Sequence, residues 1–347
     1  MTSNVGAWRT STVGGRNSLS FLLASLFWLM AVQGARGTGS ESFDVSAAGD
    51  QIVFTSTDHD LYLLELPSRE ASQLTRTSGL EASPAFSPDG TKVVYSFAPP
   101  EAHESVIRLL ELKDRTTTDL GGEKNCADAS PDFSADGGMI TFGRAHRWRP
   151  YSMGGMVWDD WDVCTMKSDG TELRRVTNQF HRRMGGPRFA ANSKSVLFSA
   201  DADTGNNHSF SALFQANIEG EAGAVVTRLD GKQIANCAAM TSAPDVDHKN
   251  DRVVFISDRV KTFEYEVFLT QPIARRSVSR KLTSLKGYLW SPKIAADANV
   301  VYFLRNVRGG FFGKDSAELW KVNADGSGQE RVAGRELFEK PLSWRGK

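Results

Sequence analysis

The residues best suited to chemistry gather in one stretch near the middle of the chain. Aromatic, arginine and aspartate side chains alternate between residues 146 and 161. Rigid aromatic rings bury a large area at low entropic cost, so this composition favours a contact surface for a protein, a peptide or a carbohydrate. The alternative is a satellite core that packs on its own part of the fold. The predicted contact residues are Arg147, Trp148, Arg149, Tyr151, Trp158, Asp159, Asp160 and Trp161.

A second candidate contact segment is basic. His181, Arg182 and Arg183 lie together and could meet an acidic peptide or a uronate. A solvated basic loop is the simpler interpretation, because exposed charges on a protein surface contribute little to the free energy of folding.

No catalytic motif accompanies these residues. The chain contains no Gly-x-Ser-x-Gly elbow and no His-Glu-x-x-His sequence. We therefore expect no catalytic residue, no metal site and no cofactor, while an enzyme remains the alternative. That enzyme would be a metal-assisted polysaccharide lyase or a hydrolase-like protein. Its site would be built from histidines at the mouth of the central channel of the fold predicted below. The histidines expected on one face are His103, His146, His181 and His208.

Three further features have simple interpretations. Residues 201–207 are rich in Asp and Asn but lack the glutamate that a calcium-binding EF-hand needs, so a solvated loop is expected. Asn207 begins a glycosylation sequon. The three cysteines are too few and too widely spaced for a disulfide framework, so we expect buried or free thiols, with a bridge between Cys126 and Cys237 as the alternative.

The charge balance and the N-terminus indicate an exported protein that binds no nucleic acid. The chain has 41 basic and 41 acidic residues, so no basic surface is expected. Arg9 and Arg16 precede an apolar run over residues 21–32, which ends in small residues. This is the pattern of a signal peptide over residues 1–34, followed by a linker over 35–41. The run is shorter than the ~20 residues of a spanning helix, so no membrane span is expected after cleavage.

An internal repeat is the main structural signal. Residues 84–90, Pro-Ala-Phe-Ser-Pro-Asp-Gly, match residues 131–137, Pro-Asp-Phe-Ser-Ala-Asp-Gly, and an apolar, aromatic strand follows each. Shorter copies start at Pro187, Pro244 and Pro292, and a copy without proline opens the array. A strand, a tight turn and a second strand form a hairpin.

A second hairpin completes each unit. Its turns are clearest at Ser168-Asp169-Gly170-Thr171 and at Ala324-Asp325-Gly326-Ser327. Four strands per repeat form a propeller blade, and a lone blade cannot bury both of its faces. We therefore predict an all-β, six-bladed β-propeller of four-stranded antiparallel blades over residues 42–347. The predicted blades cover residues 42–79, 80–123, 124–180, 181–232, 233–285 and 286–333.

The last residues are expected to close the ring. Residues 338–345, around Lys340-Pro341-Leu342-Ser343-Trp344, resemble a further inner strand and are predicted to join the first blade. A closed ring has few free sheet edges, which favours a monomer. The loops between second and third strands are longer than the other turns, and they share one face with the links between blades. We call this the loop-bearing face and expect binding there. Asp128, Asp245 and Lys293 are expected to line the channel.

The paired signatures Ser-Pro-Asp-Gly and Asp-Gly with a following valine and threonine resemble the TolB-type WD40-like repeat family. Similar repeats occur in the propellers of dipeptidyl-peptidase and prolyl-oligopeptidase relatives. The resemblance implies an exported, non-catalytic scaffold, secreted or otherwise extracytoplasmic, that holds a protein or peptide partner on the loop-bearing face. TolB itself has an N-terminal α/β domain, for which we expect no counterpart here.

Overall fold

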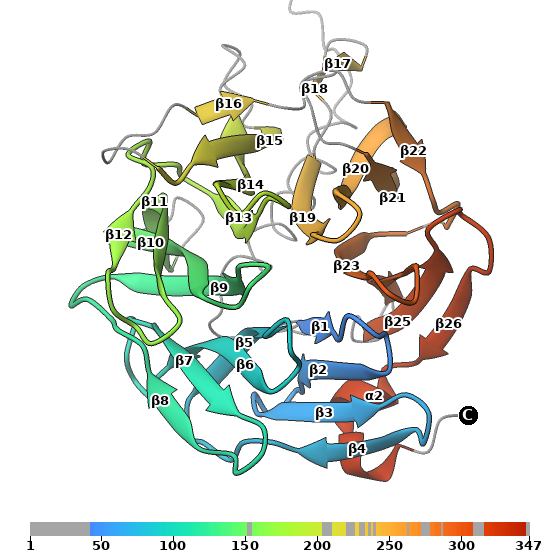
Figure 1. Cartoon of the computed structure of the whole chain (residues 1–347), viewed down its shortest axis with the longest axis horizontal. Helices are drawn as coiled ribbons and strands as arrows, with labels where there is room; N and C mark the ends of the chain where they lie inside the picture. Colours follow the sequence, from blue (N-terminus) through green and yellow to red (C-terminus); the bar gives the residue numbers. More distant parts are fainter. Residues whose placement is uncertain are drawn as a thin grey trace, which may run out of the picture.

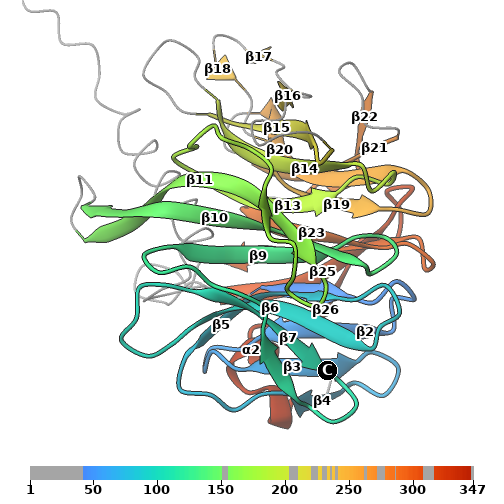
Figure 2. The same ribbon diagram turned by 60° about the vertical axis from the view of Figure 1, so that its left-hand side comes forward.

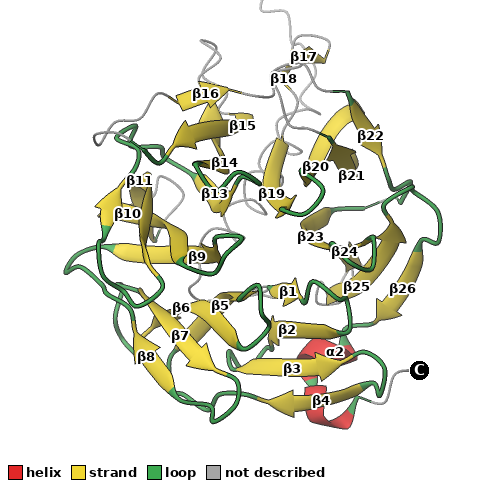
Figure 3. Cartoon of the chain, in the orientation of Figure 1, coloured by secondary structure: helices red, strands yellow, loops and turns green. Residues whose placement is uncertain are grey.

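The computed structural model describes residues 42–150, 155–202, 210–219, 226–228, 233–234, 237–238, 241–261, 264–271, 278–285, 287–307 and 316–344. Six four-stranded antiparallel sheets stand around a central axis, which confirms the predicted fold class (Figure 1). Strands dominate the described chain, and helix is confined to one place near the C-terminus (Figure 3). No helix among the described residues is long and apolar enough to cross a membrane. The predicted signal peptide and linker lie outside these residues.

Each blade runs outward from the axis in chain order. The first comprises β1 (Phe43–Val45), β2 (Gln51–Thr55), β3 (Leu61–Glu65) and β4 (Glu70–Gln73). The second comprises β5 (Leu80–Phe86), β6 (Lys92–Ala98), β7 (Val106–Glu111) and β8 (Thr117–Asp119). The third comprises β9 (Ala127–Phe133), β10 (Met139–Pro150), β11 (Met156–Lys167) and β12 (Arg174–Arg175).

The second half repeats the arrangement. The fourth blade comprises β13 (Met184–Phe189), β14 (Ser195–Ala202), β15 (Phe210–Asn217) and β16 (Val226–Arg228). A small hairpin follows, with β17 (Gln233–Ile234) and β18 (Cys237–Ala238). The fifth blade comprises β19 (Thr241–Asp247), β20 (Arg252–Lys261), β21 (Glu264–Thr270) and β22 (Ser279–Lys281). The sixth comprises β23 (Leu289–Ala295), β24 (Val300–Val307), β25 (Ser316–Asn323) and β26 (Glu330–Ala333).

The repeated Ser-x-Asp-Gly sequence forms the turn between the first two strands of a blade. The Ser87 hydroxyl donates to the Asp89 carboxylate at 2.5 Å, and the Thr91 N–H donates to the same carboxylate at 3.0 Å. Gly90 follows with φ of +69°, a conformation that glycine adopts without strain. These hydrogen bonds lower the pKa of the Asp89 carboxyl. The motif therefore fixes the hairpin turn, as its composition predicts.

The inner strands carry a bulge that the sequence does not reveal. Pairing in β5 shifts between Ala82 and Ala85, and Ser83, directly before the repeated proline, has φ of +52°. The same conformation recurs at Ser130 and Ser291. The Ser83 N–H turns inward and donates to the Ser42 hydroxyl of the neighbouring blade at 2.8 Å. The bulge thus replaces backbone hydrogen bonds within the sheet by hydrogen bonds to the neighbouring blade.

The core lies between the blades. The repeated aromatic residue of the second strand is buried in every blade, and these residues are Phe54, Tyr95, Phe142, Phe198, Phe255 and Tyr302. Apolar clusters join neighbouring sheets, such as the cluster of Val94, Ile107, Phe133 and Ile140 between the second and third blades. Stacking the blades removes this apolar surface from water, which is the main stabilising contribution. Cys126 and Cys164 are buried free thiols, and the side chain of Cys237 lies outside the described residues.

The predicted closing strand is wrong. Residues at the C-terminus form α2 (Glu336–Glu339) and the 3-10 turn η1 (Pro341–Ser343). Pro341 starts the 3-10 turn, and the helical course of the segment turns its apolar side chains toward the blades. Leu337, Phe338 and Trp344 are buried in the apolar cluster that joins the first and sixth blades. The Thr57 N–H donates to the Phe338 carbonyl at 3.0 Å. This segment therefore packs over the junction between the first and sixth blades without entering a sheet.

Candidate binding face

Blade three carries a projecting two-stranded ribbon on the loop-bearing face. Residues 144–150 and 156–161 extend β10 and β11 in place of the long loop expected between the second and third strands, with Arg147 opposite Asp159 and Pro150 opposite Met156. The inner strand β9 pairs with β10 only as far as Ala145. Figure 2 shows the ends of β10 and β11 reaching beyond the other strands of their blade. We call residues 146–150 and 156–160 the ribbon.

Trp148 and Trp158 meet a histidine from the neighbouring blade. The two tryptophans oppose each other in the ribbon, with ring centroids 5.1 Å apart. His103, on the second-to-third loop of blade two, stacks on Trp148 at 4.8 Å. The Trp158 Nε1–H donates to the His103 carbonyl at 2.8 Å. Both tryptophans remain partly exposed, so the cluster presents aromatic surface while it ties the ribbon to blade two.

The charges of the ribbon neutralise one another. The Asp159 carboxylate is buried and forms ion pairs with Arg147, at 3.2 Å, and with Arg149. Arg147 also pairs with Asp160, which has a φ of +59°. A positive φ at a residue other than glycine is strained and is common at functional sites. The ribbon is therefore held in one conformation by charge-assisted hydrogen bonds and carries no net charge from these four residues.

Trp161 belongs to the core. Its side chain is buried beside Val163 and Met184, in the cluster that joins blades three and four. The Trp161 N–H donates to the His181 carbonyl at 2.7 Å, and the His181 N–H returns a bond of 3.0 Å. The satellite-core interpretation therefore describes Trp161, whereas Trp148 and Trp158 stay available for contact. Tyr151 and Asn207 lie outside the described residues.

The basic segment His181-Arg182-Arg183, which links blades three and four, is anchored through His181. The His181 ring packs against Phe198 and Phe214, at 5.8 and 5.7 Å, and its Nδ1 lies 3.8 Å from Asp201. Burial lowers the pKa of His181, so the ring is neutral near pH 7. Arg182 is exposed, and the Arg183 N–H donates to the Asp201 carboxylate at 3.1 Å.

A cysteine, a histidine and an aspartate lie in a row at the base of the ribbon. The Cys126 sulfur is 3.9 Å from His146 Nδ1, and His146 Nε2 is 3.8 Å from Asp162. Burial raises the pKa of Cys126 and lowers that of His146, so both are neutral at pH 7. A reactive cysteine needs a lowered pKa. Asp162 already accepts bonds from the Thr177 hydroxyl and the Gln179 N–H, and it serves as a structural anchor.

Asp128, expected to line the channel, is instead buried beneath the loop-bearing face. The Arg144 guanidinium binds both of its carboxylate oxygens, at 2.6 and 2.7 Å, and also contacts Glu123 at 2.7 Å. A bidentate pair of this kind fixes its partners in one orientation. Asp128, Asp245 and Lys293 all lie on inner strands, β9, β19 and β23 respectively.

The described residues do not bring together a metal-binding group. They contain no set of three His, Cys, Asp or Glu side chains placed to hold a metal ion. His103 and His181 are engaged with aromatic rings as described above, and His208 lies outside the described residues. The histidine-based lyase therefore stays a hypothesis. The role of His103 could not be predicted from the sequence, because its partner Trp148 belongs to a different blade.

The chain shares its fold with several solved structures, although no family model matches the sequence. It is similar to TolB from Acinetobacter baumannii, at 17% identity and a TM-score of 0.59, over 92% of this chain and 69% of that one. It is also similar to an oligogalacturonate lyase in complex with manganese, at 13% identity and a TM-score of 0.58, over 84% and 76%. A prolyl endopeptidase matches at 15% identity and a TM-score of 0.51, over 84% and 42%. In fold, the chain is a six-bladed β-propeller that is similar to the propellers of these structures.

Proposed function

We propose that this chain is an exported, non-catalytic scaffold that binds a protein or peptide partner through its loop-bearing face, with the ribbon of blade three at the centre of the contact. One observation carries the proposal: β10 and β11 continue past the inner strand β9 and present Trp148 and Trp158 against His103. A rigid strand pair with partly exposed tryptophans and arginines has the composition of an interaction hot spot.

Several features support a binding role for this ribbon. Its backbone is fixed by the Asp159 ion pairs, so little conformational entropy is lost when a partner binds. Met156, at its end, is 40% exposed, and Phe180, on the adjacent link, is 48% exposed. Apolar side chains beside paired charges suit a partner segment that offers both apolar and polar groups.

The experiment uses a defined probe. A random peptide library displayed on phage is selected against the full chain, and the enriched peptides are measured by calorimetry on three variants. Trp158→Ala and Arg147→Ala should weaken binding about tenfold or more, as hot-spot truncations do. Leu173→Ala, an exposed apolar residue between β11 and β12, is the matched control and should bind normally. Peptides that bind both ribbon variants with unchanged affinity would contradict the proposal.

Export has its own test. The full chain is expressed in a secretory host, and the mass of the secreted protein is measured. We expect cleavage near Gly34 and a mature chain that begins close to the first blade. A secreted or cell-associated protein that retains Met1 would show that the N-terminal segment is not a cleaved signal.

A further inference from the structure

One position of the repeat is charged in five of the six blades. It follows the repeated proline, and its residues are Asp44, Ala85, Asp132, Arg188, Asp245 and Lys293. They lie on β1, β5, β9, β13, β19 and β23, the inner strands that surround the axis (Figure 1). Each stands within the last three residues of its strand, close to the turn that leads to the second strand. The five charged side chains therefore occupy one level of the molecule.

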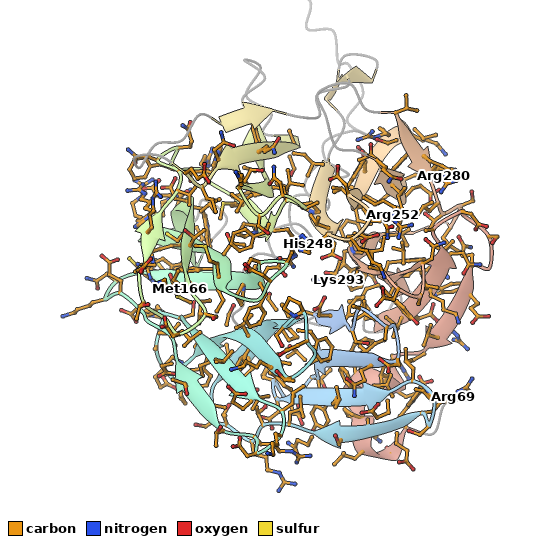
Figure 4. The ribbon with its side chains drawn as sticks, viewed as in Figure 1. Arg69, Met166, His248, Arg252, Arg280 and Lys293 are labelled. Atoms are coloured by element: carbon orange, nitrogen blue, oxygen red, sulfur yellow. The ribbon has the colours of Figure 1, made fainter. Side chains whose placement is uncertain are left out.

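Their side chains join in a chain of ion pairs across blades. The Lys293 ammonium lies 3.1 Å from Asp44 and 3.6 Å from Asp245. The Arg188 guanidinium lies 3.4 Å from Asp245 and 3.9 Å from Asp132. Figure 4 shows Lys293 beside the centre of the propeller. We call Asp44, Asp132, Arg188, Asp245 and Lys293 the charge ring, because they link blades three, four, five, six and one.

Two of the carboxylates are also anchored to the backbone of the next blade. Asp44 accepts the Phe86 N–H at 2.8 Å, and Asp245 accepts the Ile294 N–H at 2.9 Å. Asp132 occupies the same position in its blade, but within the described chain its one close polar partner is Arg188 at 3.9 Å. Asp132 is therefore the least compensated carboxylate of the charge ring.

The charge ring contains three carboxylates and two cations. Blade two places the buried Ala85 where a further cation would separate Asp132 from Asp44. The charged groups that act on Asp132 are Arg188, Lys293, Asp245 and Asp44. Its partner on β10, Thr141, carries no charge. Burial, opposed by the two cations, raises the pKa of Asp132 to about 7.

We propose that the charge ring stabilises the folded propeller in a pH-dependent way. Its charges are balanced when Asp132 is protonated, and one carboxylate lacks a compensating cation when Asp132 ionises. The protonated ring has two carboxylates for two cations, and its blades are held together from the inside. Ionisation adds a negative charge near Asp44 and Asp245 in poorly solvated surroundings. Because the folded state prefers the protonated form, the stabilisation is complete below the unfolded pKa of ~3.9 and is lost as the pH rises through about 7.

The test compares thermal unfolding of the full chain at pH 6 and pH 8. The melting temperature of the wild-type chain should fall between these values by ~2–4 °C more than that of Asp132→Asn, which cannot ionise. Asp136→Asn is the control, because Asp136 lies on the turn after the same strand, outside the charge ring, and its pKa is lowered. It should follow the wild-type curve.

A measurement on the unaltered protein keeps the proposal testable if the variant folds poorly. Carbon-detected NMR of the aspartate carboxyls, assigned by through-bond correlation to the backbone of Asp132, gives the pKa of Asp132 directly. Amide exchange, corrected for its intrinsic pH dependence, reports opening of β9 and β13. We expect titration near neutral pH and faster opening of these strands at pH 8. Titration below pH 5, or parallel melting curves for wild type and Asp132→Asn, would overturn the proposal.

Discussion

At the residue scale, the strongest determinant of the fold is the apolar residue that follows the repeated proline by two positions. Phe86 and Phe133 occupy this position in adjacent blades and are 8% and 3% exposed. Phe133 packs against Val94, Ile107 and Ile140, so it contributes to the cluster that joins its blade to the previous one.

We predict that Phe86→Ala and Phe133→Ala each lower the free energy of unfolding by about 3–5 kcal/mol, because each leaves a cavity between blades. Denaturant unfolding followed by far-ultraviolet circular dichroism measures the loss. Leu342→Ala, at a residue that is 51% exposed, is the control and should change stability by less than ~0.5 kcal/mol. A loss below ~1 kcal/mol at both phenylalanines would contradict the observed burial.

Glu81 makes a second contribution to the pH dependence of stability. It is 1% exposed and accepts hydrogen bonds from the Thr75 and Thr77 hydroxyls and the Leu61 N–H. Burial raises its pKa to about 7 despite these bonds. The folded state therefore favours the protonated acid, and this stabilisation is lost as the pH rises through about 7.

We expect Glu81→Gln to reduce the fall in melting temperature between pH 6 and pH 8, in addition to the effect of Asp132→Asn. The two residues lie in different contacts, so their effects should add in the double variant. Thermal unfolding at both pH values checks this. A pH dependence in Glu81→Gln equal to that of the wild type would show that Glu81 is ionised throughout.

At the element scale, the ribbon combines a buried base with an exposed end. Trp161 and Trp158 are three residues apart in one strand, yet Trp161 is 4% exposed and Trp158 is only partly buried. Composition could identify this stretch as a contact surface or a core, but it could not assign individual residues. The distinction depends on where β9 begins, opposite Ala145, and on His103 of another blade. Both are properties of the assembled ring.

We predict that Trp161→Ala lowers the free energy of unfolding by about 3–5 kcal/mol, as expected for a buried aromatic residue. Trp158→Ala removes one hydrogen bond to the His103 carbonyl and part of a ring stack, so a loss of about 1 kcal/mol is expected. Denaturant unfolding of both variants makes the comparison. Equal losses would place Trp158 in the core and remove it from the proposed contact surface.

The repeat predicted most elements because each hairpin is determined locally. The Ser-x-Asp-Gly turns and the apolar strands after them are encoded within a few residues, and these hairpins form as expected. The closing segment resembles an inner strand in sequence but is helical, because Leu337, Phe338 and Trp344 pack against the cluster that joins blades one and six, and that cluster exists only in the assembled ring. The serine bulges before the repeated prolines were not predicted, because a positive φ at serine serves contacts with the adjacent blade.

At the scale of the whole molecule, the first and sixth blades must be held together although no strand is shared between them. In the described chain, the sheet of blade one consists of β1 to β4 alone, and that of blade six of β23 to β26. Among the contacts that bridge this seam, Lys293 contacts Asp44 at the axis, and the C-terminal segment covers the outer apolar cluster with Phe338. The helix α2 lies behind β2 and β3 in Figure 1.

We therefore predict that truncation after Ala333 opens the ring at this seam. It removes Leu337, Phe338 and Trp344, whose burial contributes about 1.5–3 kcal/mol each. The truncated chain should melt at a lower temperature, and its amide exchange should increase first in β1, β2 and β24, which border the seam, while blade three stays protected. Truncation after Trp344 keeps the whole packed segment and is the control. If protection is lost evenly across all blades, the seam is no weaker than the other junctions, and the C-terminal segment stabilises the molecule without closing it.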